Sequence, residues 1–146
     1  MSTTYTKRLA AFRQELLAFL VAHGYGSPSC SGGLVQFKAD GLTFCVLLDD
    51  GDPEYVRISL PNFHYCDTMI QTRLAELVAA DCQRRYKLGE YTVVGQWVSA
   101  QVPLLIDTPG FLTQERLFRL TQSLRTMAQD FVERMKAPAA ERGSRQ

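Results

Sequence analysis

The sequence has no excess of charge of either sign and no long apolar run. Lysine and arginine total 16 against 15 for aspartate and glutamate, a formal net charge of +1. Proteins that neutralise many phosphates usually carry a clear basic excess, so we expect no nucleic-acid partner. No stretch approaches the roughly 20 apolar residues that a membrane-spanning helix needs. We therefore expect no membrane contact.

The N-terminal segment has only part of what a secretion signal requires. The stretch "KRLAAFRQELLAFLVAHG" begins with basic residues, but Arg13, Gln14 and Glu15 interrupt its apolar run and no A-x-A-type cleavage site follows. None of the four cysteines stands in a C-x-x-C pair. These features together are typical of a cytoplasmic protein with reduced thiols.

Metal and cofactor motifs are also lacking. Zinc sites favour closely spaced ligand pairs, and the sequence offers only His64 with Cys66. The stretch "DDGDP" (residues 49–53) lacks the alternating ligands and distal glutamate of a calcium loop, so we interpret it as a turn. The loop "GYGSPSCSGG" (residues 24–33) follows a predicted helix, whereas a dinucleotide-binding loop follows a strand. We expect no metal and no cofactor.

Residues for catalysis are few. The chain has two histidines, His23 and His64, and no motif that names a reaction, so we expect that it is not an enzyme. One alternative stays open. A pocket near His64, Tyr65 and Cys66 could hold a small ligand or an enzymatic site.

What is present indicates a small α+β domain. Apolar residues at helical spacing predict a helix over residues 4–22, which ends at His23-Gly24. The dipeptide Asp40-Gly41 between two β-rich runs predicts a tight hairpin in which Phe37 faces Phe44. The register then places these side chains on one face: Val35, Phe37, Ala39, Leu42, Phe44, Val46 and Leu48.

The remaining elements follow from similar signals. A third strand, "EYVRISL" (residues 54–60), precedes a second helix, which Asp67 or Thr68 begins and which continues to about Lys87. The cations at its end, Arg84, Arg85 and Lys87, suit the negative end of the helix dipole. Two strands follow, "YTVVGQWV" and "QVPLLI" (residues 91–98 and 101–106), with Pro103 placing the fifth strand at an edge or a bulge.

A long last helix begins at Thr113. Its predicted buried stripe comprises Leu117, Leu120, Leu124, Met127, Phe131 and Met135. The predicted order is α-βββ-α-ββ-α, an antiparallel sheet with helices packed against it. We expect one domain over residues 1–136 and a disordered tail over residues 137–146.

This order resembles the type III secretion chaperone-like fold and, within it, the YbjN family of putative bacterial sensory-transduction regulators. The resemblance is carried by "DGLTFCVLL", by "LVAADCQRRYKLG" and by the β segment before the last helix. It implies a non-enzymatic, chaperone-like or regulatory protein that binds another protein and forms a homodimer.

Four side chains are candidates for protein binding: Tyr55, Arg57, Tyr91 and Trp97. Aromatic residues and arginine are the types that anchor protein interfaces. Tyr91 and Trp97 are expected on one face of a single strand, and Tyr55 and Arg57 on the outward face of the third. The simplest interpretation of Trp97 is that it completes the core under the last helix. An exposed edge at the fifth strand could instead accept another chain by strand addition.

Overall fold

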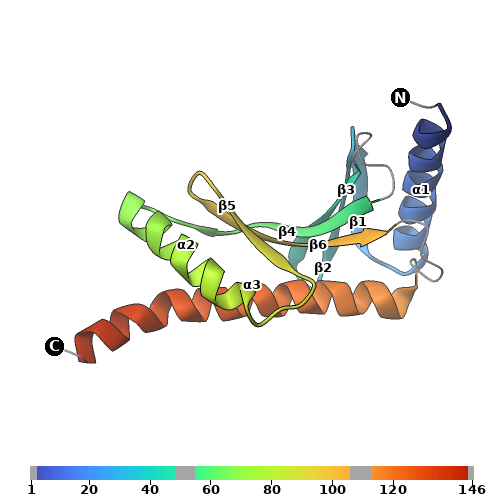
Figure 1. Ribbon diagram of the computed structural model, residues 1–146. Coiled ribbons are helices and arrows are strands. Elements are labelled where there is room, and N and C mark those ends of the chain that lie inside the picture. Colours follow the sequence, from blue (N-terminus) through green and yellow to red (C-terminus); the bar gives the residue numbers. More distant parts are fainter. Residues whose placement is uncertain (1–2, 49–54, 106–112, 145–146) are drawn as a thin grey trace.

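The computed structural model describes residues 3–48, 55–105 and 113–144 (Figure 1). These residues form three helices and one six-stranded antiparallel sheet with the strand order β1-β2-β3-β4-β6-β5. The elements in chain order are α1 (Thr3–Ala22), β1 (Gly26–Ser31), β2 (Leu34–Ala39), β3 (Leu42–Leu48), β4 (Tyr55–Tyr65), α2 (Met69–Gln83), β5 (Glu90–Val94), β6 (Trp97–Leu105) and α3 (Gln114–Ser144). The α+β class is confirmed, with one strand more than predicted. The predicted turn at residues 49–53 lies outside the described residues.

The hairpin of β2 and β3 has the predicted register. Phe37 pairs with Phe44 and their rings stack with centroids 5.7 Å apart. The turn residues Asp40 and Gly41 have φ values of 51° and 80°, as a type I′ turn requires. Turn chemistry and hydrophobic pattern therefore select the same pairing, because a slip of one residue would turn the apolar face outward.

The prediction of a loop over residues 24–33 is wrong for residues 26–31. Gly26–Ser31 forms the edge strand β1, which pairs with β2 across a two-residue turn of Gly32 and Gly33. The register of β1 shifts beside Ser27, whose φ is 49°. Such irregularity is tolerated at an edge, where only one neighbour has to be matched.

Strand β4 is longer than predicted and includes the "PNFHY" segment. It pairs with β6 along its length, with a register shift between Leu60 and His64 and a φ of 51° at Asn62. Pro61 lies at this irregularity, where the loss of a backbone donor costs least.

Helix α2 begins as predicted and ends early. The hydroxyl of Thr68 accepts a hydrogen bond from the Gln71 amide, 3.1 Å away, as an N-cap does. The helix ends at Gln83, so Arg85 lies beyond the last turn, where it pairs with Asp130 of α3 at 3.2 Å. An ion pair with α3 therefore replaces the predicted interaction of Arg85 with the dipole of its own helix.

Helix α3 runs along the length of the sheet and links the two parts of the core (Figure 1). The Thr113 hydroxyl caps it by accepting from the Arg116 amide at 3.1 Å. Leu117, Leu124, Met127 and Phe131 are buried, which confirms the centre of the predicted stripe. The helix continues to Ser144 and so includes most of residues 137–146, whose disorder remains a prediction.

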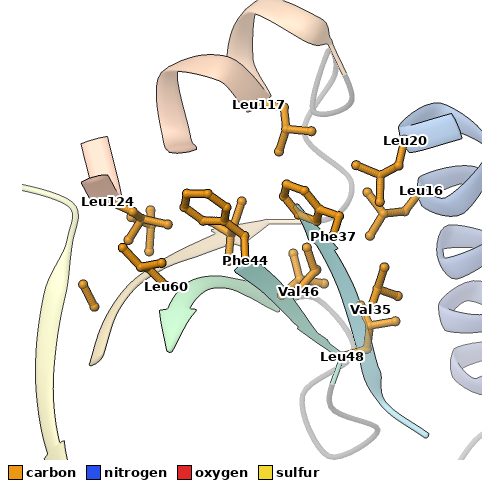
Figure 2. Packing of buried hydrophobic residues seen from close by; sticks show 14 of the residues in the cluster. Leu16, Leu20, Val35, Phe37, Phe44, Val46, Leu48, Leu60, Leu117 and Leu124 are labelled. Atoms are coloured by element: carbon orange, nitrogen blue, oxygen red, sulfur yellow. The ribbon is translucent and has the colours of Figure 1, made fainter. Parts of the chain in front are cut away.

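All three helices pack on one face of the sheet. Leu16 and Leu20 of α1 and Leu124 of α3 meet Phe37 and Phe44 in one cluster (Figure 2). Helix α2 packs by a second cluster against Val98, Tyr91 and Val93. Since Val98 and the buried Val102 are four residues apart on β6, both clusters lie on the same face. The side chains that alternate with these point away from the helices, and we call their side the outer face.

The sheet is staggered. Strand β5 pairs with β6 only from Trp97 to Gln101, so Pro103 lies where β6 pairs with β4 alone. The prediction that the fifth strand is an edge therefore applies to its second half only. Similarly, β3 pairs with β4 only as far as Ser59.

Candidate functional site

The predicted group of Tyr91 and Trp97 is divided between the two faces of the sheet. A tight turn at Gly95 and Gln96 separates them, so Trp97 begins β6 instead of continuing the strand of Tyr91. Tyr91 points into the core, where its hydroxyl donates to the Met127 carbonyl oxygen at 2.7 Å. Burial raises the pKa of the Tyr91 hydroxyl. Tyr91 therefore supports the packing of α3 and does not belong to an exposed binding surface.

Trp97 does not complete the core, contrary to the simplest interpretation of the sequence. Its side chain is 43% exposed and its ring packs on Tyr65, with centroids 4.8 Å apart. The Tyr65 hydroxyl donates to the side-chain oxygen of Gln96 at 3.2 Å. Val94, opposite Trp97 on β5, is also exposed. Tyr65, Trp97 and Val94 form a row across three strands of the outer face, which we call the aromatic row.

Tyr55 and Arg57 also lie on the outer face, as predicted. Both are exposed, and Arg57 stands between Leu47 of β3 and Pro103 of β6. Pro103 is six residues from Trp97 along β6, about 20 Å. The structure therefore places Tyr55, Arg57 and Trp97 on one face but in two separate groups.

The surface between these groups is polar. The Gln101 amide donates to the Glu90 carboxylate, and the Ser99 hydroxyl oxygen accepts from the Asn62 amide at 2.8 Å. The outer face thus has an exposed group with aromatic side chains at each end and a hydrogen-bonded middle.

The three residues of the alternative ligand pocket point in different directions. The His64 ring lies against Phe131, with centroids 5.4 Å apart, and burial lowers its pKa. Tyr65 lies on the outer face, whereas Cys66 is fully buried under α2. Burial raises the pKa of the Cys66 thiol, which keeps it protonated and a poor nucleophile. The structure does not bring these three side chains to one pocket.

A second exposed surface lies on α2. The side chains of Ile70 and Leu77 are 79% and 70% exposed. They are seven residues apart and share one side of the helix, whereas the buried side carries Ala75, Val78 and Cys82. We call Ile70 and Leu77 the α2 stripe. The sequence does indicate an exposed apolar side of α2, because apolar residues occupy more than one side of this helix.

Within the described ranges, no group of three or more histidine, cysteine, aspartate or glutamate side chains is placed to hold a metal ion. None of the helices described has the length and apolar character that crossing a membrane requires.

No protein-family model matches the chain, and neither does any curated protein sequence. Among solved structures, the chain is similar to an uncharacterized protein from Methanothermobacter thermautotrophicus. The TM-score is 0.61 and the identity 7%, over 87% of this chain and 98% of that one. At this identity the likeness concerns the fold alone.

Proposed function

We propose that the chain is a non-enzymatic, protein-binding domain with a chaperone-like or regulatory role in the cytoplasm. The observation that carries this proposal is the outer face, where the aromatic row and the pair Tyr55 and Arg57 remain exposed while all three helices occupy the opposite side. Tryptophan, tyrosine and arginine are enriched among the few side chains that carry most of the binding energy at protein interfaces. Membership of the YbjN-like family and of the type III secretion chaperone-like fold remains a proposal that rests on the sequence motifs.

We also propose that the domain forms a homodimer through the α2 stripe. Large apolar side chains exposed together on one side of a helix are typical of surfaces that another protein covers. Two copies of the same helix can meet across a two-fold axis, which buries both stripes at once.

A pull-down with the immobilised domain tests the partner proposal. The lysate comes from the source organism, and the bound proteins are identified by mass spectrometry. We expect one protein in stoichiometric amount, lost when Trp97→Ala and Arg57→Ala are combined. The matched control is Arg119→Ala, an exposed arginine on α3 with 77% side-chain exposure. A protein that the double variant still captures would contradict binding at the outer face, and the absence of a specific protein would contradict the proposed function.

Light scattering after size-exclusion chromatography tests the homodimer. We expect the mass of two chains for the native protein and of one chain for Leu77→Glu, because a buried unpaired charge opposes association. Leu88→Glu is the control, since Leu88 is equally exposed but lies outside α2. A monomeric native protein, or a dimer that survives Leu77→Glu, would rule out the α2 stripe as the interface.

The alternative function, a ligand-binding or enzymatic site near His64, Tyr65 and Cys66, has less support because these side chains diverge. Replacing His64 and Cys66 together separates the two hypotheses. Partner binding should survive in a protein-binding domain, whereas a site built on these residues would be lost.

A further inference from the structure

Helix α3 carries apolar side chains at nearly every turn where it passes α2 and the sheet (Figure 1). Leu124, Met127, Phe131 and Met135 lie three or four residues apart and pack in the two core clusters. A slip of α3 by one turn would bring Met127 or Met135 to the position of Phe131. Methionine adapts to irregular gaps, so apolar side chains would still fill the core. The apolar stripe alone therefore does not single out one register of α3.

Two further contacts of α3 are equally tolerant of a slip. The buried side of α2 consists mainly of small residues, Ala75, Ala79 and Cys82, which form low ridges against a neighbouring helix. The Tyr91 hydroxyl donates to the Met127 carbonyl oxygen, but a carbonyl group recurs in a similar position at each turn of a helix. Neither contact distinguishes the observed register from one that is displaced by a turn.

Two ion pairs join α3 to the C-terminal end of α2 and to the turn that follows it. The Arg134 guanidinium donates to the Asp81 carboxylate, and the Arg85 guanidinium lies 3.2 Å from the Asp130 carboxylate. In both segments the acid comes first and the base follows four residues later, about one helical turn. Because the pairs 81–134 and 85–130 run in opposite directions, the segments are antiparallel and each acid meets a base.

A slip of one turn in either direction would bring like charges together. If Asp130 moved to the position of Arg134, it would face Asp81. If Arg134 moved to the position of Asp130, it would face Arg85. The Asp130 side chain is only 19% exposed, so solvent screens its charge incompletely. Only the observed register pairs all four charges with opposite ones.

A third charged contact lies nearer the start of α3. The Arg125 guanidinium donates to the carbonyl oxygens of Ala39 and Asp40, each at 3.3 Å, and lies 3.5 Å from the Asp40 carboxylate. A slip of one turn would replace Arg125 by Thr121 or Gln129, neither of which carries a charge. This contact opposes the same displacements.

We propose that the ion pairs Asp81–Arg134 and Arg85–Asp130 select the register of α3. The apolar stripe drives the helix onto the sheet and accepts more than one alignment, whereas the order of the four charges accepts a single one. The inference goes beyond the proposed function, because it requires no partner and holds for a monomer and a dimer alike. Its test is therefore independent of the pull-down and of the light-scattering measurement.

The test reverses the order of the charges on one side and keeps the composition. Combining Asp81→Arg with Arg85→Asp makes the observed register bring like charges together twice, while a slip in either direction forms one opposite pair. We expect α3 to be displaced or to lose a single register. Adding Asp130→Arg and Arg134→Asp restores both opposite pairs and should return α3 to the observed register. All proteins carry Tyr86→Phe, which removes the hydroxyl that donates to Asp130 at 3.3 Å.

Double electron–electron resonance between two nitroxide labels measures the register. The labels are attached through Glu76→Cys on α2 and Ser123→Cys on α3, both at exposed positions, and Cys30→Ser removes the exposed native thiol. A slip of one turn changes the distance between the labels by about 5 Å. The matched control combines Glu115→Arg with Arg119→Glu, which reverses an exposed ion pair within α3 and should leave the distance unchanged.

The outcomes are distinct. A displaced or broadened distance in the Asp81 and Arg85 variant, which returns to the native value in the fourfold variant, supports the proposal. A native distance in the Asp81 and Arg85 variant overturns it, because the register would then be set by apolar packing. A fourfold variant that does not regain the native distance, or a control whose distance shifts, overturns it as well.

Discussion

At the scale of single residues, glycine positions mark where two backbones approach most closely. A Cβ atom added to Gly33 would collide with the Leu48 carbonyl oxygen, and the Leu48 amide already donates to the Gly33 carbonyl oxygen at 2.7 Å. A backbone atom in a sheet cannot move aside as a flexible side chain can. Gly33 therefore holds the turn between β1 and β2 against the end of β3.

We predict that Gly33→Ala lowers the free energy of unfolding by about 1–3 kcal/mol, the usual cost of overpacking. Urea denaturation followed by circular dichroism measures it. Gly26→Ala is the control, since its added Cβ would meet the Lys38 side chain at an ordinary 3.4 Å. Equal free energies of unfolding for the Gly33→Ala and Gly26→Ala proteins would show that an added Cβ close to Leu48 does not destabilise the fold.

The half-buried ring of His64 gives the domain a predicted pH dependence. Burial lowers its pKa in the folded state, so the unfolded chain binds a proton more readily. The stability that neutral His64 provides is complete above the unfolded pKa of about 6.5 and declines as the pH falls below it. We predict that His64→Gln reduces the loss of stability between about pH 7 and pH 5.

Thermal unfolding at several pH values checks this prediction. If stability declines as steeply in the His64→Gln variant as in the native protein, the packing of His64 on Phe131 is not the cause of the decline.

At the scale of elements, the predictions that rest on neighbouring residues agree with the structure. The hairpin at Asp40-Gly41 and the starts of α2 and α3 lie where the sequence predicts them, because each depends on residues a few positions apart. The elements that the sequence pattern does not predict depend on pairing with another segment of the chain. Strand β1 consists of glycine, serine, proline and cysteine, and it is a strand because β2 supplies a pairing edge.

The cap of α3 carries an element-scale prediction. Thr113→Ala removes the acceptor for the Arg116 amide and should lower the free energy of unfolding by about 1 kcal/mol. Thr113→Ser keeps the oxygen and should change stability little. Chemical denaturation compares the three proteins, and a serine variant as unstable as the alanine variant would contradict the capping role.

At the scale of the whole molecule, α3 joins the two core clusters. Phe131 of α3 is fully buried and meets the rings of Phe63, His64 and Tyr91 at centroid distances of 5.5, 5.4 and 5.8 Å. The same helix carries Leu117 and Leu124 into the cluster formed with α1 and the hairpin. We therefore expect the chain to unfold as one cooperative unit.

We predict that Phe131→Ala costs about 3–5 kcal/mol, as expected when a buried aromatic ring is removed. Circular dichroism, which reports on helices, and Trp97 fluorescence, which reports on the sheet, should shift together. Phe118→Ala on the same helix is the control, because Phe118 is 55% exposed. Separate transitions by the two probes would show that the clusters unfold independently.

The sequence by itself determined the features that depend on residues close together in the chain. These are the α+β class, the hairpin register, the helix starts and most of the buried stripe of α3. Tertiary structure alone decided which side chains remain exposed. Tyr91 and Trp97 are six residues apart, yet the turn at Gly95 sends one into the core and leaves the other on the outer face. Ile70 and Leu77 look like core residues until the packing of α2 turns them outward. Tertiary structure likewise decided that β4 beyond Ser59 pairs with β6 and not with β3. Burial and strand pairing depend on contacts between distant segments, and the periodicity of one segment does not specify its distant partner.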